Sequence, residues 1–300
     1  MDYTKRITLY IIFYIYLNVL NIFIFDFLLT LLYNISLVGG IKLKFLIVGD
    51  VVGKTGVERL KNELKKRSDI DFCIVNGENS ASGRGIRKRE YEEILNSGAD
   101  IITMGNHMYY RKEMASEYSK LTRLAIPANI TNLIGNKNVV VEKNGIKVGV
   151  INLLGTFAMG DMIVKNIINP FKVVIDQIEE LKKQEVKYIF VDFHAEATAE
   201  KLAMGHFLKD KVNCVFGTHT HVQTSDERIF DTGMAYITDV GMTGPKDSVL
   251  GLKTEIAIKR FTTGEYAHYE CSDNEAIFNA IEIEFDDNTN KAISIKRINE

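Results

Sequence analysis

The chain has 300 residues, of which 46% are hydrophobic and 25% are charged, enough to bury a core in one large domain or two small ones. Its 37 Lys and Arg residues nearly balance its 39 Asp and Glu residues, which argues against a long nucleic acid as a partner and leaves a small anionic substrate open. The three cysteines form no CxxC pair, which argues against a disulfide framework or a thiolate metal site and fits a reducing compartment.

The N-terminal region differs in composition from the rest of the chain. Residues 7–25 form an uncharged apolar run about long enough to cross a bilayer, and a second apolar stretch covers 27–38. Lys5 and Arg6 precede the first run, so a single span would place the downstream chain outside the cytoplasm. A membrane anchor is therefore one interpretation of this extension, and a membrane is a partner only if residues 7–38 are that anchor.

A translation start placed too early is the other interpretation of the same region. Gly39-Gly40 can be the translated form of a ribosome-binding sequence, and Leu43 can be encoded by an alternative start codon at a suitable spacing. Residues 1–42 would then be dispensable and the protein cytoplasmic. We expect this outcome, because an exported chain would expose its cysteines to an oxidising space.

From residue 43 onward, the hydrophobic pattern predicts strands that alternate with helices. The predicted strands are 44–49, 71–75, 100–104, 187–193 and 212–216, with helices at 55–67, 87–98, 171–184 and 197–208 between them. Residues 139–153 form a predicted hairpin through the turn signal Asn144-Gly145. Further strands are predicted at 234–238, 255–261, 276–287 and 291–298. This order predicts one α/β domain, residues 43–300, with two packed sheets flanked by helices.

Polar side chains follow the predicted strands where each strand ends, which is where α/β folds build their sites. They are Asp50, Glu78, Asn79, Asn106, His107, His194, His219 and His221. If the chain stays extended, His219 and His221 share one face, with about 6.5–7 Å between their Cα atoms. Each residue alone has an ordinary structural explanation, such as a helix cap or a turn. Together they are oxygen and nitrogen donors without sulfur, a set that suits Mn²⁺, Fe or Zn²⁺.

Two glycine-rich segments give weaker evidence about function. Residues 49–55, GDVVGKT, look like a phosphate-binding loop, but that motif has four residues between its glycines and this segment has three. Residues 80–85, SASGRG, are predicted to form a flexible loop beside the site.

Longer motifs carry a family resemblance. Gly-Asp, Gly-Asn-His and Gly-Thr-His-Thr-His are similar to motifs of the calcineurin-like metallophosphoesterases. The segments GDVVGKTG, NGENSASGRGI, GNHMYYRKE, VDFHAEATAEK, GTHTHVQTSDERI and ITDVGMTGP resemble the YmdB-like branch more closely. The resemblance runs from about Leu43 to the C-terminus. It implies a four-layer α/β/β/α sandwich and two divalent metal ions, with Fe or Mn favoured and Zn as an alternative.

The resemblance also implies roles for individual residues. One metal would be held by Asp50, Glu78, Asn79 and His221, and the other by Glu78, Asn106, His194 and His219, so that Glu78 bridges. His107 would donate a proton to the leaving group, with an orienting role as the alternative. Asp192 and Glu196, which flank His194, would support the ligands. Asp50-Val51-Val52 lacks the histidine of the wider superfamily, and Met108-Tyr109-Tyr110 departs from the branch itself.

The function that the resemblance implies is hydrolysis of 2′,3′-cyclic nucleotides by a metal-bridging hydroxide, with other cyclic nucleotides as further candidate substrates. A cyclic nucleotide is then the small-molecule partner, and homo-oligomerisation stays open. Two alternatives use the same metals: a phosphomonoesterase (nucleotidase or protein phosphatase), and a regulatory module that retains metals without turnover. The remaining histidines, His206 and His268, are expected to be structural or surface groups.

Overall fold

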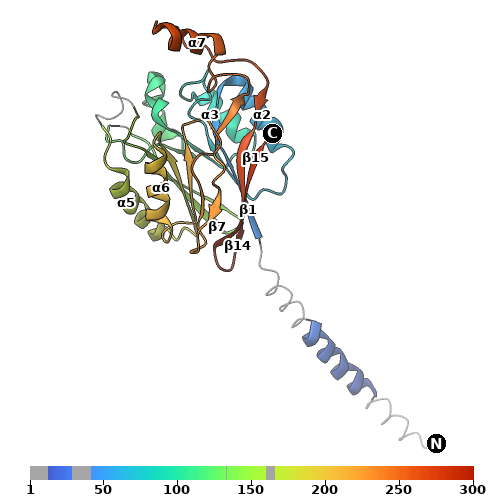
Figure 1. The fold of residues 1–300 in the computed structure, drawn as a ribbon. Coiled ribbons are helices and arrows are strands. Elements are labelled where there is room, and N and C mark those ends of the chain that lie inside the picture. Colours follow the sequence, from blue (N-terminus) through green and yellow to red (C-terminus); the bar gives the residue numbers. More distant parts are fainter. Residues whose placement is uncertain (1–12, 29–41, 133, 160–165) are drawn as a thin grey trace, which may run out of the picture. The chain divides into compact units, whose positions relative to one another are not determined.

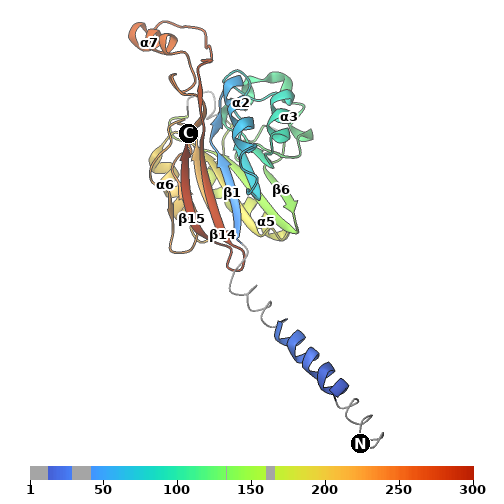
Figure 2. The same cartoon turned by 90° about the vertical axis from the view of Figure 1, so that its right-hand side faces the viewer.

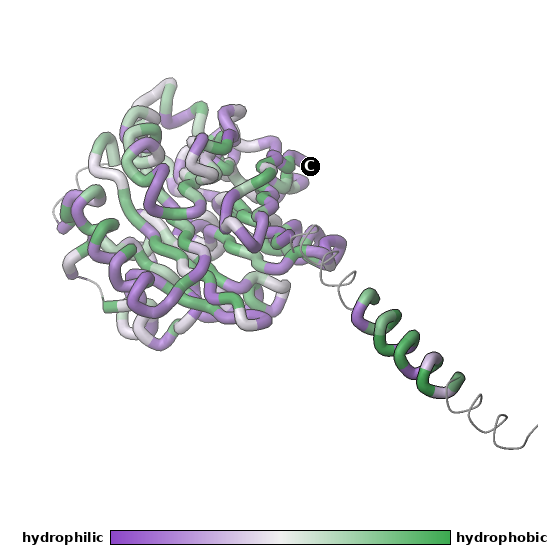
Figure 3. Tube along the Cα trace, turned by 90° about the horizontal axis from the view of Figure 1, so that it is seen from below, coloured by the Kyte–Doolittle hydropathy of each residue, from purple (hydrophilic) through white to green (hydrophobic). Residues whose placement is uncertain are grey.

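The computed structural model describes residues 13–28, 42–132, 134–159 and 166–300 (Figure 1). The chain divides into two units, Met1–Ile41 and Lys42–Glu300. In the first unit, residues 13–28 form a helix that is mostly hydrophobic along its length (Figure 3). Within the described ranges, no helix is both long enough and apolar enough to span a membrane. Most of the predicted second apolar stretch, and Gly39-Gly40, lie outside the described residues.

The larger unit is built on two six-stranded sheets and one small sheet. The first contains, in spatial order, β15 (Lys291–Asn299), β14 (Asn279–Asp286), β1 (Lys42–Val48), β3 (Phe72–Asn76), β4 (Ile101–Thr103) and β5 (Leu124–Ala125). The second contains β10 (Arg228–Ile229), β11 (Ala235–Ile237), β9 (Cys214–Thr218), β8 (Tyr188–His194), β7 (Ile146–Leu154) and β6 (Asn138–Lys143). The small sheet contains β13 (Ala276–Ile277), β12 (Met242–Pro245) and β2 (Asp50–Val51).

Helices connect the parallel strands, as a parallel pair requires a long crossover. α2 (Gly53–Leu64) joins β2 to β3, and α3 (Lys88–Asn96) joins β3 to β4. In the second sheet, α5 (Pro170–Lys183) joins β7 to β8, and α6 (Thr198–Leu208) joins β8 to β9. α5 begins where the side chain of Asn169 accepts a hydrogen bond from the Phe171 N–H, with Pro170 at the first helical position. Consecutive parallel strands therefore end at the same edge of each sheet.

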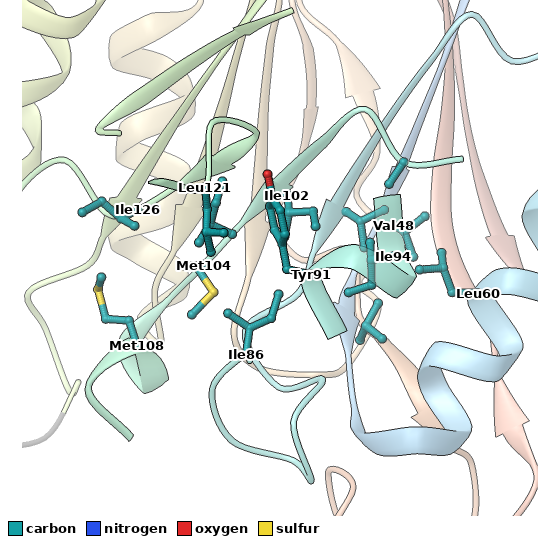
Figure 4. Packing of buried hydrophobic residues seen from close by; sticks show 14 of the residues in the cluster. Val48, Leu60, Ile86, Tyr91, Ile94, Ile102, Met104, Met108, Leu121 and Ile126 are labelled. Atoms are coloured by element: carbon teal, nitrogen blue, oxygen red, sulfur yellow. The ribbon is translucent and has the colours of Figure 1, made fainter. Parts of the chain in front are cut away.

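The core has three clusters of buried side chains. One packs α2 and α3 on the first sheet and includes Leu60, Ile94 and Ile102 (Figure 4). The second joins strands of both large sheets through aromatic residues; the ring centroids of Phe45 in β1 and Phe190 in β8 are 4.8 Å apart. The third packs α5 and α6 on the second sheet. These clusters pack helices against two sheets, as predicted for an α/β domain.

The predicted strand at 255–261 is wrong, because these residues lie in the helix α7 (Thr254–Thr263). The alternation Glu-Ile-Ala-Ile-Lys is typical of a strand, yet only Ala257 is buried, and Ile258 and Phe261 are 55% and 87% exposed. With few buried contacts, the helix-forming residues Glu, Ala, Lys and Arg decide the local structure. Gly264, at φ 71°, ends the helix in the left-handed conformation. Figure 2 shows α7 at the margin of the larger unit.

Candidate metal centre

The strand ends of both large sheets bring all the predicted ligands together. Asp50 lies in β2 and Asn106 begins a short 3₁₀ helix (Asn106–Tyr110) after β4. Glu78 and Asn79 follow β3, His194 ends β8, and His219 and His221 follow β9. Glu78, His194 and His219 each offer one ligand atom, and these atoms all lie within 4.8 Å of one another.

One group of ligand atoms surrounds Nε2 of His194. This nitrogen lies 3.2 Å from Glu78 Oε1 and 2.9 Å from Asn106 Oδ1. His219 Nδ1 lies 3.0 Å from the same nitrogen. These four residues are the set that the resemblance implies for one metal.

A second group surrounds Asn79. Its amide nitrogen lies 3.0 Å from His221 Nε2, 3.2 Å from Glu78 Oε1 and 3.4 Å from Asp50 Oδ1. Asp50 Oδ1 is also 3.8 Å from His221 Nε2. Glu78 Oε1 therefore belongs to both groups, as a bridging ligand would. In this arrangement Asn79 turns its amide nitrogen toward the carboxylates, and a half-turn of the amide would present its oxygen to a cation.

The histidine tautomers test whether the residues fit a metal. The outer nitrogens face oxygen atoms: Thr218 Oγ1 for His194 (2.8 Å), Glu196 Oε2 for His219 (3.1 Å) and Leu250 O for His221 (3.1 Å). Thr218 gives its own hydroxyl proton to Asp192, so it accepts from His194. If each outer nitrogen donates its proton, the lone pair of His194 Nε2 faces Glu78 Oε1 and that of His219 Nδ1 faces His194 Nε2, and such lone pairs repel unless a cation lies between them. The donor set therefore fits divalent cations.

Burial and neighbouring charges shift the pKa values of these groups. Burial, reinforced by Glu78, raises the pKa of Asp50 to about 8 against the opposing effect of His194. Burial also opposes ionisation of Glu78, but His194 and His107 outweigh it and hold the pKa of Glu78 well below its usual range. Burial lowers the pKa of His219 to about 2 and that of His221 to about 4, which keeps both imidazoles neutral, as metal ligands must be. Burial also opposes protonation of His194, but Glu78 and Asp50 outweigh it and raise the pKa of His194 to about 9, so this imidazole must lose a proton to hold a metal.

The segment that carries His219 and His221 is not extended, and the prediction of a shared strand face is wrong. β9 continues through Gly217 to Thr218, and the next residues turn. His219 and His221 have φ angles of 102° and 63°, a conformation that costs about 1–3 kcal/mol for a residue with a side chain. This turn directs the two imidazoles into different ligand groups.

A buried ion pair that the sequence did not predict supports this turn. Lys201 of α6 pairs with Asp239 (Nζ to Oδ2, 2.6 Å), and both side chains are 1% exposed. Lys201 Nζ also donates to the carbonyl of Thr218 (2.7 Å), and Asp239 Oδ2 accepts from the Thr220 N–H (3.1 Å). Because an unpaired buried charge costs about 3–5 kcal/mol, each partner depends on the other. The ion pair therefore holds in place the backbone on both sides of His219. We call residues 219–221 the histidine turn.

Asp192 and Glu196, which were predicted to support the ligands, lie beside the ligand groups. Asp192 is fully buried and accepts hydrogen bonds from Asn76 (3.0 Å) and Thr218 (2.7 Å) as well as from Thr103. Thr218 links Asp192 to His194. The sequence did not indicate a role for Thr218, because this residue lies within the histidine motif and is not a candidate ligand. Burial raises the pKa of Asp192.

Gly105 precedes Asn106 at the point of closest packing in the centre. A Cβ atom at this position would lie 2.1 Å from Glu78 Oε2 and 2.4 Å from His194 Nε2. Neither atom belongs to a flexible chain end, since both side chains are buried. Only glycine lets the backbone pass so close to the two ligands.

His107 lies beside both ligand groups. Its Nδ1 is 2.7 Å from Asn79 Oδ1 and 3.1 Å from Glu78 Oε1, and its backbone N–H donates to Glu78 Oε2 (3.1 Å). Its Nε2 meets no hydrogen-bond partner in the described part of the chain. The side chain is 24% exposed and lines a cavity of about 250 Å³ together with Glu78 and His219. His206 and His268 are exposed, as predicted.

The fold and the ligand groups define an α/β protein of the metallophosphoesterase type. A crystal structure described as a novel phosphatase from Mycoplasma pneumoniae superposes with a TM-score of 0.80 at 38% identity and covers 87% of this chain and 94% of its own. A hypothetical protein from Thermus thermophilus gives a TM-score of 0.79 at 30% identity, covering 86% of this chain and 99% of its own.

Sequence comparison narrows this class. The model of the YmdB-like protein family matches residues 46–298. A protein of Bacillus subtilis named 2′,3′-cyclic-nucleotide 2′-phosphodiesterase is 41% identical over 260 residues, which are 85% of this chain and 96% of the relative. The chain belongs to the YmdB-like family.

Proposed function

We propose that this chain is a metal-dependent phosphodiesterase that hydrolyses 2′,3′-cyclic nucleotides. The observation that carries the proposal is the pair of ligand groups that share Glu78 Oε1 beside His107 in one cavity. The name of the Bacillus subtilis relative supports the choice of substrate. Fe or Mn is the favoured metal, because all the donors are oxygen or nitrogen, and Zn is the alternative.

The residues of the metal centre would have different roles in the reaction. Two divalent cations would neutralise the anionic diester and lower the pKa of a water molecule. Asp50, Glu78, Asn79, Asn106, His194, His219 and His221 would hold them. In the reaction a water molecule loses a proton and its oxygen forms a bond to phosphorus, while the bond from phosphorus to O2′ breaks and O2′ takes a proton. His107 would supply that proton from Nε2, while the Glu78 carboxylate faces its Nδ1 and supports the protonated ring.

We also propose that the architecture is the four-layer α/β/β/α sandwich that the resemblance implies. The three core clusters support it: the inner one joins the two large sheets, and each outer one packs helices on one sheet. In this arrangement the parallel strands of both sheets direct their carboxyl ends to a common site.

A substrate panel tests the function. The purified protein, loaded with Mn²⁺ or Fe²⁺, is offered 2′,3′-cyclic nucleotides, 3′,5′-cyclic nucleotides, nucleoside monophosphates and p-nitrophenyl phosphate. We expect the highest kcat/KM for a 2′,3′-cyclic nucleotide, with the nucleoside 3′-phosphate as product. A preference for the monoesters would replace the proposal with a phosphomonoesterase, and metal binding without turnover of any substrate would indicate a regulatory module.

We propose that the protein acts in the cytoplasm and does not need residues 1–42. The family match begins at residue 46, and β1 begins at Lys42. A chain trimmed to residues 43–300 is expected to match the full chain in kcat/KM. Fractionation of the source cells should recover the native protein in the soluble fraction. Recovery from membranes alone, with peptides from residues 1–42 in the mass spectrum, would establish the anchor instead.

A further inference from the structure

A cation that contacts two aromatic rings lines the metal cavity. The guanidinium carbon of Arg84 lies 4.4 Å from the ring centroid of Tyr269 and 4.8 Å from that of Tyr110. Arg84 Nη1 also donates a hydrogen bond to the Tyr110 hydroxyl. Arg84 and Tyr269 line the cavity together with His107. Arg84 and Tyr269, which are far apart in the chain, therefore form one wall of the cavity, and Tyr110 packs on Arg84.

The wall is held in place before any ligand binds. The turn at 80–85, predicted to be flexible, is closed by hydrogen bonds from the Ala81 N–H to Gly85 O (2.9 Å) and from the Gly83 N–H to Asn79 O (3.0 Å). Arg111 Nε donates to the carbonyl of Arg84 (3.0 Å). Gly83 has a φ of 82°, and a Cβ there would lie 2.5 Å from the Tyr269 hydroxyl, so the ring packs directly on the turn.

Arg59, Arg67 and Arg87 each lie beside a glutamate, whereas no described carboxylate pairs with Arg84. A guanidinium has five N–H donors, and the hydrogen bond that the Arg84 side chain makes to Tyr110 uses Nη1. The edge formed by Nε and Nη2 therefore keeps two parallel donors for a ligand.

The wall lies where the ribose and base of a cyclic nucleotide, the parts that do not react, would bind. The ring of Tyr110 contacts both Arg84 and His107, with ring centroids of His107 and Tyr110 5.3 Å apart. The reacting phosphorus must lie within reach of His107, and Arg84 and Tyr269 line the same cavity. The ribose and base of a bound cyclic nucleotide would extend from the phosphorus within this cavity. Aromatic faces stack on bases, and arginine donors pair with base acceptor atoms.

We propose that Arg84 and Tyr269, with Tyr110 behind them, form the subsite that binds the nucleoside part of the substrate. This inference rests on the proposed function, because it assigns a specificity site to the same reaction. The metals and His107 act on the phosphodiester, and the subsite selects esters that carry a base.

Two cyclic diesters test the subsite. A 2′,3′-cyclic nucleotide and glycerol 1,2-cyclic phosphate contain the same five-membered phosphodiester ring, and only the first has a base. Arg84→Gln and Tyr269→Leu should raise KM for 2′,3′-cyclic AMP roughly tenfold or more, with kcat little changed. Hydrolysis of glycerol 1,2-cyclic phosphate should stay within about twofold of wild type. Tyr266→Leu is the matched control, because Tyr266 is 87% exposed and lies three positions earlier.

Two results would overturn the inference. An equal loss on both diesters would assign Arg84 to the phosphoryl group, and no change on either would leave the three side chains a purely structural role. Arg84→Lys keeps the charge without the planar pair of donors, and it should behave like Arg84→Gln. If Arg84→Gln or Tyr269→Leu does not fold, Arg84→Lys decides the same question.

Calorimetry separates this inference from the proposed function. If the wild-type protein hydrolyses neither cyclic diester, the proposed function fails, while binding still tests the subsite. Adenosine 3′-phosphate should bind roughly tenfold or more tightly than glycerol 1-phosphate, and Arg84→Gln should remove the difference. Equal binding of the two phosphates by the wild-type protein would overturn the subsite.

Discussion

Glu78→Ala is expected to remove both metal ions and to lower kcat/KM for a 2′,3′-cyclic nucleotide by at least about 10³-fold. The reason is the position of Glu78 Oε1, which lies 3.2 Å from both His194 Nε2 and the Asn79 amide nitrogen and so belongs to both ligand groups. Elemental analysis of the purified variant measures the bound metal, and steady-state kinetics measures the turnover.

Glu196→Ala provides the graded control for this experiment. Glu196 contacts the outer nitrogen of His219, so its loss should weaken metal binding about 10- to 100-fold and leave full occupancy at saturating metal. Full metal content and full activity in Glu78→Ala would show that Glu78 does not bridge.

His107→Ala is expected to keep both metals and to lose about 10²- to 10⁴-fold in turnover of cyclic nucleotides. The leaving O2′ is an alkoxide that needs a proton, whereas p-nitrophenolate leaves without one. The loss on bis-p-nitrophenyl phosphate should therefore be much smaller. The measurement is kcat for both substrates, with metal content confirmed for each preparation.

His206→Ala is the matched control for His107, since His206 is exposed on α6. It should resemble the wild-type protein with both substrates. An equal loss on the two substrates in His107→Ala would instead assign His107 an orienting role, consistent with its contacts to Glu78 and Asn79.

The grouping of the candidate ligands could be predicted from the sequence because each one follows a strand within a short local motif. The alternation of strands and helices places the ends of parallel strands at one edge, so Asp50, Glu78 and His194 meet without any knowledge of side-chain contacts. The conformation of the histidine turn could not be predicted in this way. It depends on Lys201 and Asp239, which are separated along the chain and meet only when α6 packs on the second sheet.

The difference between local patterns and long-range contacts also explains which elements of the fold were predicted correctly and which were not. The hairpin through Asn144-Gly145 was predicted correctly, since a turn signal and the flanking apolar residues are neighbours in sequence. Residues 255–261 were not, because an alternating pattern indicates a strand only if one face is buried, and burial depends on distant segments. The wall formed by Arg84 and Tyr269 also joins remote parts of the chain, and no local pattern indicates it.

The crowding at Gly105 offers a way to study the protein in living cells. One added methyl group at this position, in Gly105→Ala, would occupy the space between Glu78 and His194 without altering the molecular surface. The resulting distortion would be confined to the interior of the centre. Cells carrying this allele would keep the polypeptide while lacking catalysis. Comparison with a gene deletion would then separate phenotypes caused by lost hydrolysis from those caused by the missing polypeptide.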